Sequence, residues 1–305
     1  ADAGASADVV DGGADTDRLL YSNVTVGVTI NLSSGQATPA GGAADTLSAL
    51  EEVVGSGQQD AITGSAASEV LIAGDGDDTI TPGGGNDNVT GNGGNDICIA
   101  SALGDGNDVF DGGGGTNVMS YAVRTSGQPI TFQSSMGTTG GGDGETDQLV
   151  NVAQINGGEG NDVLEGYSVF NGNGGNDTIS NATSVSGGNG NDAISATLGD
   201  DDIDAGAGND TIVETDTGAA ESSDSFTGGS GVDHISYAAR TNSGVRIIQD
   251  GVANDGKTGE NDNVTGFERI TTGDGADNIS GTSGADVIVT GNGADIVSGG
   301  GGSDT

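Results

Sequence analysis

Large apolar residues recur at intervals of nine along much of the chain, separated by glycine, asparagine, threonine and aspartate. Ile62, Leu71, Ile80, Val89 and Cys98 form one unbroken series. A fixed period of this kind indicates a repeat architecture, in which each repeat buries its apolar residue against its neighbours. The pattern therefore predicts short strands that are joined by turns and stacked as the coils of a solenoid.

Acidic residues share this period and stand two positions before the apolar residues. The first acidic series is Asp60, Glu69, Asp78, Asp87 and Asp96. Two later series are Asp192, Asp201 and Asp210, and Asp277, Asp286, Asp295 and Asp304. One repeat is thus used many times, with a carboxylate at a fixed place in each turn.

The best-formed repeats are GGEGNDVLE at 157–165, GGNGNDAIS at 187–195 and AGAGNDTIV at 205–213. They resemble the RTX family of hemolysin-type calcium-binding repeats, whose pattern is G-G-x-G-x-D-x-U-x, with U a large aliphatic residue. The resemblance implies an all-β fold, a parallel β-roll or β-helix solenoid of nonapeptide repeats. In that fold GGxGxD is a turn, x-U-x is a short strand, and successive turns alternate between two edges.

The chemistry of the repeat agrees with Ca²⁺ as its ligand. Glycine permits left-handed backbone conformations that direct carbonyl oxygens inward, and aspartate adds a charged oxygen. Calcium takes about six to eight oxygens at about 2.3–2.6 Å, whereas Mg²⁺ requires a stricter octahedral site. The predicted metal ligands are Asp60, Asp78, Asp87, Asp96, Asp108, Asp162, Asp177, Asp192, Asp201, Asp210, Asp224, Asp233, Asp277, Asp286, Asp295 and Asp304.

If turns alternate between two edges, the carboxylates that share an ion lie eighteen residues apart and stack with a spacing of about 4.8 Å. The pairs predicted in this way are Asp60 with Asp78, Asp78 with Asp96, Asp192 with Asp210, Asp277 with Asp295, and Asp286 with Asp304. The chain departs from aspartate at Glu69, Asn117, Ser168 and Thr183, which weakens the case for a site at those places.

A longer period lies above the nonapeptide. Tyr21, Tyr121 and Tyr237 each precede a threonine by four residues and are followed by an alternating stretch, a glycine-rich loop and two short apolar segments. We interpret the chain as three modules in one continuous solenoid, each with inserted strands or hairpins. The modules are residues 1–107, 108–223 and 224–305, and the paired segments begin at residues 45, 147 and 262. By this alignment, residues 43–54 are expected to form strands instead of a helix.

The step between repeats shortens to six residues at 162–168 and 177–183, while Phe170 and Val185 keep the apolar rhythm. Such a turn is too short for the GGxGxD pattern. We therefore expect a continuous core beside interrupted rows of calcium sites.

Composition explains why a metal is needed. The 305 residues include 46 acidic and 6 basic side chains, for a formal net charge of -40, and only 32% are apolar. This combination is typical of disordered chains, but the regular apolar positions argue for a thin repetitive fold. The self-repulsion of so many carboxylates opposes compaction unless cations neutralise them. With one cysteine and one histidine, a disulfide framework, a cysteine zinc site and most catalytic triads are excluded.

Four other features have a functional and a simpler interpretation. GVANDGKT at 251–258 matches a P-loop, but the Gly- and Asn-rich segment after it does not predict the required helix, so no nucleotide is expected. Cys98 is expected to be a buried apolar residue, and His234 a surface residue without a catalytic role. The three module tyrosines are expected to pack the inserts, the alternative being a row that stacks on carbohydrate.

We therefore expect a calcium-binding structural or surface protein, not an enzyme, that folds when Ca²⁺ binds and can assemble into an extracellular layer, filament or adhesin. The resemblance implies type I secretion and folding outside the cell. The alternatives are a non-catalytic appendage of a longer secreted enzyme or toxin, and an ice- or polysaccharide-binding face. Expected partners are calcium ions and, beyond them, another copy of the chain or a cell surface. No nucleic acid is expected, and no apolar run is long enough to predict a membrane span.

Overall fold

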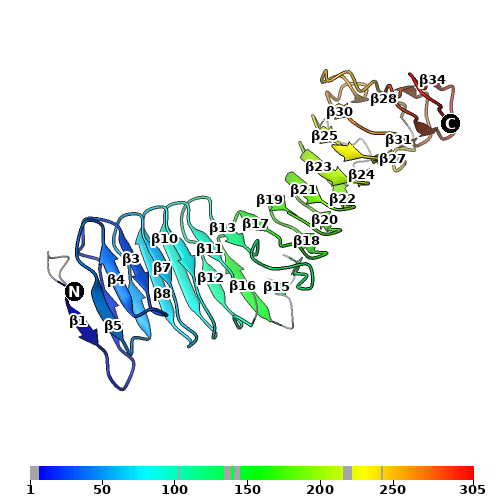
Figure 1. Ribbon diagram of the computed structural model, residues 1–305. Helices are drawn as coiled ribbons and strands as arrows, with labels where there is room; N and C mark the ends of the chain where they lie inside the picture. The colour runs from blue at the N-terminus through cyan, green and yellow to red at the C-terminus, as the bar shows by residue number, and fades with distance from the viewer. Residues whose placement is uncertain (1–6, 102–103, 134–138, 141–144, 216–221, 242) are drawn as a thin grey trace. The chain divides into compact units, whose positions relative to one another are not determined.

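Every element in the described part of the chain is a β-strand (Figure 1). The computed structural model describes residues 7–101, 104–133, 139–140, 145–215, 222–241 and 243–305. Its contacts divide the chain into two compact units, Ala1–Gly158 and Glu159–Thr305. The all-β solenoid predicted from the repeats is confirmed within each unit. None of the described segments forms an apolar helix of the length needed to cross a bilayer.

Two sheets make up the first unit. One sheet has the order β1 (Val9–Asp11), β5 (Asp45–Ser48), β4 (Gln36–Pro39), β3 (Val28–Asn31), β7 (Ala61–Thr63), β9 (Thr79–Thr81), β11 (Ile97–Ile99), β13 (Val118–Ser120), β17 (Gln154–Asn156). The other has the order β2 (Arg18–Leu20), β6 (Glu52–Val54), β8 (Val70–Asp75), β10 (Asn88–Gly93), β12 (Val109–Asp111), β16 (Thr146–Val150), β15 (Thr139–Gly140), β14 (Thr131–Gln133). Successive strands from β6 to β13 fall in alternate sheets, so the chain coils between two edges as expected.

The second unit repeats this plan. One sheet has the order β19 (Val169–Asn171), β21 (Ser184–Asn189), β23 (Asp202–Gly208), β25 (Ser225–Thr227), β30 (Asn263–Thr265), and β26 (Ser230–Gly231) also pairs with β23. A second has the order β18 (Val163–Glu165), β20 (Thr178–Ser180), β22 (Ala193–Ala196), β24 (Thr211–Glu214), β27 (His234–Tyr237), β31 (Arg269–Thr272), β33 (Val287–Val289). A third has the order β29 (Gly256–Lys257), β28 (Val245–Ile247), β32 (Asn278–Ser280), β34 (Ile296–Ser298).

The core is one apolar residue thick on each sheet. In the parallel ladder through β7, β9 and β11, Ile62 lies opposite Ile80, and Ile80 lies opposite Cys98. All three are at most 1% exposed. Val297, which stands two positions after Asp295, is half exposed, since its strand β34 pairs with β32 alone among the described strands.

The inserts are antiparallel additions to parallel sheets. Strands β3, β4 and β5 pair antiparallel, as do β14, β15 and β16, and β28 with β29. The segment 43–54 forms strands β5 and β6, which confirms the strand prediction. Phe170 and Val185 are buried, so the core continues past the short turns. The glycine-rich loop of the second module lies largely outside the described residues, and the three-module division remains an interpretation.

Candidate metal centre

The predicted aspartates stack at the turns and are joined by one repeated hydrogen bond. Asp177 donates its backbone N–H to Oδ1 of Asp192 at 2.8 Å, and Asp192 donates to Oδ1 of Asp210 at 2.8 Å. We call each such series an aspartate ladder. A turn thus holds the carboxylate of the next turn against its own backbone, which fixes the position of both.

Eight aspartate ladders are seen in the described residues. In the first unit they run Asp8–Asp45, Asp17–Glu51, Asp60–Asp78–Asp96–Asn117 and Glu69–Asp87–Asp108–Asp147. In the second they run Asp162–Asp177–Asp192–Asp210–Asp233–Glu268, Asp201–Asp224–Asp262, Asp277–Asp295 and Asp286–Asp304. Every predicted eighteen-residue pair is therefore stacked.

Departures from aspartate have two outcomes. Asn117 keeps its place in a ladder, because its Oδ1 accepts the backbone N–H of Asp96 at 2.9 Å. At the short turns Thr183 donates its backbone N–H to the carbonyl of Ser168 at 3.1 Å, a contact without a carboxylate. One edge of the second unit thus loses its ladder there, as the six-residue steps predict.

Many ladder carboxylates use only one of their two oxygens. The second oxygen, Oδ2, is buried and has no hydrogen-bond partner in Asp78, Asp87, Asp96, Asp177, Asp192, Asp210 and Asp233. Buried polar atoms are normally satisfied, and an orphaned carboxylate oxygen is costly. Carboxylate oxygens of this kind are ligands for hard cations, so these residues are suited to hold calcium.

The pKa values of the ladder carboxylates also favour a bound cation. The pKa of Asp78 is raised to about 7, chiefly by burial; the carboxylates of Asp60 and Asp96 also raise it, and the backbone N–H of Asp60 lowers it. Burial likewise raises the pKa of Asp177 to about 8 and that of Asp210 to about 6. Without a bound cation, ionised ladder carboxylates therefore disfavour the folded state near neutral pH.

The glycine five positions before the aspartate lets a backbone carbonyl oxygen and a carboxylate oxygen lie close to the same point. A Cβ atom at Gly187 would lie 2.3 Å from the carbonyl oxygen of Ala205 and 2.6 Å from Oδ2 of Asp192. The carbonyl of the stacked turn and the carboxylate of the same turn thus approach one backbone position that has no room for a side chain. Nowhere in the described chain do three or more His, Cys, Asp or Glu side chains group as a metal site. An ion held here must therefore combine carboxylate with backbone oxygens, as calcium does.

A second ladder, which the sequence analysis did not predict, runs beside the first. Asn176 donates its backbone N–H to the side-chain Oδ1 of Asn161, and Asn191 donates to Asn176, each at 2.7 Å. These bonds run from the later turn to the earlier, opposite to the aspartate ladder. In the sequence, the recurring Asn-Asp dipeptide was the feature from which this second ladder could have been predicted. Adjacent turns are therefore tied in both directions.

The module tyrosines satisfy carboxylates without a metal. Tyr121 is fully buried, and its hydroxyl donates to Oδ2 of Asp147 at 2.6 Å. The equivalent bonds join Tyr21 to Asp45 at 3.1 Å and Tyr237 to Asp262 at 3.3 Å. Burial of all three tyrosines confirms the packing interpretation, and the exposed carbohydrate-stacking row is wrong.

Two modules also carry a buried arginine. Nη2 of Arg124 lies 2.8 Å from Oδ1 of Asp105 and 2.8 Å from Oε2 of Glu145, and its guanidinium lies 5.1 Å from the ring centre of Tyr121. The corresponding residues of the third module are Arg240, Glu260 and Tyr237. In the first module Val24 takes this place. The guanidinium thus supplies positive charge inside the solenoid where the inserts join it.

The other sequence predictions have clear outcomes. Cys98 is 1% exposed in the core, and burial raises the pKa of its thiol, as expected of an apolar packing residue. Residues 256–257 form the short strand β29, so the P-loop-like segment does not open a helix. His234 is half buried, with Nε2 2.9 Å from the hydroxyl of Thr271, and is less exposed than predicted.

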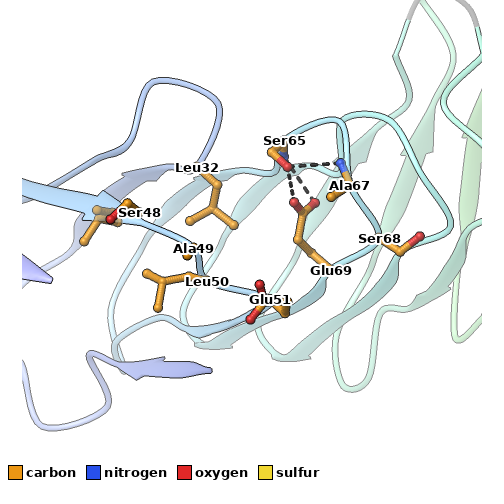
Figure 2. Close-up of a pocket in the computed structure, with 10 residues that line it drawn as sticks. Leu32, Ser48, Ala49, Leu50, Glu51, Ser65, Ala67, Ser68 and Glu69 are labelled. Atoms are coloured by element: carbon orange, nitrogen blue, oxygen red, sulfur yellow. Dashed lines mark hydrogen bonds between the residues drawn. The ribbon is translucent and has the colours of Figure 1, made fainter. Parts of the chain in front are cut away.

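A small cavity of about 180 Å³ lies in the first unit between Leu32, Leu47, Leu50 and the turn that carries Glu69 (Figure 2). Figure 2 shows both carboxylate oxygens of Glu69 turned toward Ser65. The backbone N–H of Ser65 donates to Oε2 at 3.1 Å, and its hydroxyl donates to Oε1. Where glutamate replaces aspartate, the turn therefore satisfies the carboxylate itself.

Comparison with protein-family models identifies the repeat. The model described as RTX calcium-binding nonapeptide repeat (4 copies) matches residues 1–21, 63–98, 103–120, 181–212 and 271–305. The matched stretches include ladder positions in both units, among them Asp78 and Asp192. A search of curated proteins finds no match.

Proposed function

The chain is an RTX calcium-binding repeat protein, and we propose that it folds into its β-roll outside the cell when the ladder carboxylates bind Ca²⁺. The observation that carries the proposal is the row of buried Oδ2 atoms that have no hydrogen-bond partner. Bound calcium would supply positive charge and accept about six to eight oxygens at each such place. The ladder aspartates hold these oxygens in register, and the turn glycines let backbone carbonyls approach them.

The charge balance supports coupling between binding and folding. Stacked carboxylates repel one another, and the sequence has 46 acidic residues against 6 basic ones. The raised pKa of Asp78 reflects the same repulsion together with burial. Metal binding to the folded state alone contributes its free energy directly to folding. Extracellular calcium-binding modules in general have dissociation constants of about 10⁻⁴–10⁻³ M, a range that suits folding after secretion.

We further propose a structural or adhesive role at a cell surface, without catalysis, with an appendage of a longer secreted protein as the alternative. The repeat ladders of both units and the burial of Cys98 in the core support a non-catalytic role. Each coil presents the same backbone edges to its neighbours, a geometry suited to a stiff, repetitive scaffold.

Sedimentation velocity on the 305-residue chain, first in chelator and then across a calcium titration to the millimolar range, tests the proposal. A slowly sedimenting chain that becomes one compact species supports calcium-coupled folding and a monomeric role. Growth into large particles supports a layer or filament. A sedimentation coefficient that does not change with calcium contradicts the proposed function.

A further inference from the structure

Two types of turn differ in the residue four positions before the acidic residue. The seven aspartates whose buried Oδ2 has no hydrogen-bond partner all have glycine or asparagine there. These residues are Gly74, Gly83, Asn92, Asn173, Gly188, Gly206 and Gly229, and each has a positive φ between 67° and 128°. We call these open turns.

In the second type that residue is a serine or threonine whose backbone N–H donates to the carboxylate of its own turn. Thr282 donates its backbone N–H to Oδ2 of Asp286 at 2.9 Å and its hydroxyl to Oδ1 at 3.0 Å. Ser56 contacts Asp60 in the same way through its backbone N–H and its hydroxyl. The same backbone N–H bond joins Ser65 to Glu69, Ser101 to Asp105 and Thr197 to Asp201. We call these closed turns.

Backbone conformation explains the difference. In open turns the residue at this position pairs between coils, as Gly188 does with Gly206 and Asn92 with Gly74. A Cβ at Gly188 would lie 2.2 Å from the carbonyl oxygen of Asn173, and L side chains other than asparagine rarely adopt its φ of 104°. Serine and threonine do not have left-handed φ values at the closed turns, and their N–H groups face the carboxylate instead.

We propose that this position decides which turns take calcium. Glycine or asparagine with a positive φ leaves the second carboxylate oxygen open to an ion, whereas serine or threonine closes the turn with an internal N–H and, at Ser56 and Thr282, a hydroxyl. Asp78 and Asp96 are then calcium ligands, and Asp60 and Asp286 are structural rungs of their own ladders that take no ion of their own.

This inference rests on the proposed function and refines it. The closed turns lie in sequence segments that still carry the acidic residue, GSGQQD at 55–60, GSAASE at 64–69 and GTSGAD at 281–286. A count of acidic residues alone would therefore overstate the number of ions. It also follows that a closed turn keeps its geometry without metal, because protein donors replace the ion.

The test is to open closed turns and count ions. Ser56→Gly and Thr282→Gly are made in the full 305-residue chain, one in each unit, with Ser56→Ala as the matched control that removes the hydroxyl without favouring a left-handed φ. Bound calcium is counted by equilibrium dialysis at saturating calcium, and compaction is checked by sedimentation. We expect one additional calcium per chain for each glycine variant and no change for Ser56→Ala.

Each result is decisive. A gain of one ion in both glycine variants, which simple damage to the fold cannot produce, supports the proposal. If a compact glycine variant binds as many ions as the parent chain, or fewer, the proposal is overturned while calcium-coupled folding stands. A gain in Ser56→Ala equal to that in Ser56→Gly overturns the role of backbone conformation. If the parent chain itself binds no calcium and stays expanded, the result contradicts the proposed calcium-coupled folding and not only the distinction between open and closed turns.

Discussion

Acid should compact the metal-free chain, opposite to the usual acid denaturation of proteins. The perturbation is a change from pH 8 to pH 5 in chelator. Asp78 is 1% exposed, and burial raises its pKa from 3.8 to about 7 in the folded state. Because this pKa is raised, the folded chain binds the proton more tightly than the unfolded chain. The resulting stabilisation is complete below about pH 4 and is lost as the pH rises through about 7.

The magnitude follows from linkage. Between pH 8 and pH 5, the proton on Asp78 stabilises the folded state by about 2–3 kcal/mol, since each pKa unit is worth about 1.4 kcal/mol. Asp87 and Asp177, with pKa values raised to about 6 and about 8, act in the same direction. Neighbours in one ladder titrate together, so their effects do not add in full. Several such carboxylates nevertheless approach the total stability of a typical domain.

The assay is sedimentation velocity with far-ultraviolet circular dichroism at several pH values in chelator. Asp78→Asn should make the dependence of folding on pH shallower by about 2 kcal/mol between pH 8 and pH 5, because one titrating group is lost. Asp15→Asn removes the same charge at an exposed position that does not act on the pKa of Asp78, and is the matched control. Expansion of the parent chain on acidification, or equal slopes for the two variants, would refute this reasoning.

Three further outcomes are expected. In calcium, Gly55→Ala should lower the free energy of unfolding, measured by urea titration, by about 2 kcal/mol or more, because its Cβ would lie 2.3 Å from both the Ala73 carbonyl oxygen and Oδ2 of Asp60. The control is Gly57→Ala, whose Cβ would meet nothing within 4 Å and which should leave the free energy of unfolding nearly unchanged. Cys98 should resist a thiol reagent in calcium and react in chelator, and equal rates in both would contradict metal-coupled burial of the core. Arg124→Met should cost about 3–5 kcal/mol, because the carboxylates of Asp105 and Glu145 lose their counter-charge inside the solenoid. Arg18→Met, at an exposed pair with Glu52, should cost about 0–1 kcal/mol. Similar urea midpoints for the two variants would argue against the buried cluster.

Much of the fold could be predicted from the sequence because each repeat packs against its neighbours in the same way. The nine-residue period placed Ile62, Ile80 and Cys98 in one buried row, and the predicted eighteen-residue pairing of carboxylates is present. The alternation of the two sheets and the strand character of residues 43–54 were also predicted correctly. Val297 holds the same place in its repeat as the buried Ile279 but is half exposed, since burial depends on the strands beside it and not on the repeat itself.

The candidate site was predicted only in outline. The repeat identified the carboxylates, but the direction of their hydrogen bonds and the asparagine ladder required coordinates. The serine and threonine residues of the closed turns were visible in the sequence, yet their meaning depends on the sign of φ and on which atoms they face. Such details follow from contacts within a stacked turn, which composition does not encode.

The sequence by itself determined the period, the core rows, the all-β class and the demand for cations, because these depend on which residue types recur and how often. Tertiary structure alone decided which carboxylate oxygens are left open, which are closed by Ser56 or Thr282, and which are bonded by Tyr121 and Arg124. The physical reason is that the hydrogen bonds of a buried oxygen depend on the conformation of its own turn, as at Ser56, and on the stacking of one coil on another, as at Tyr121.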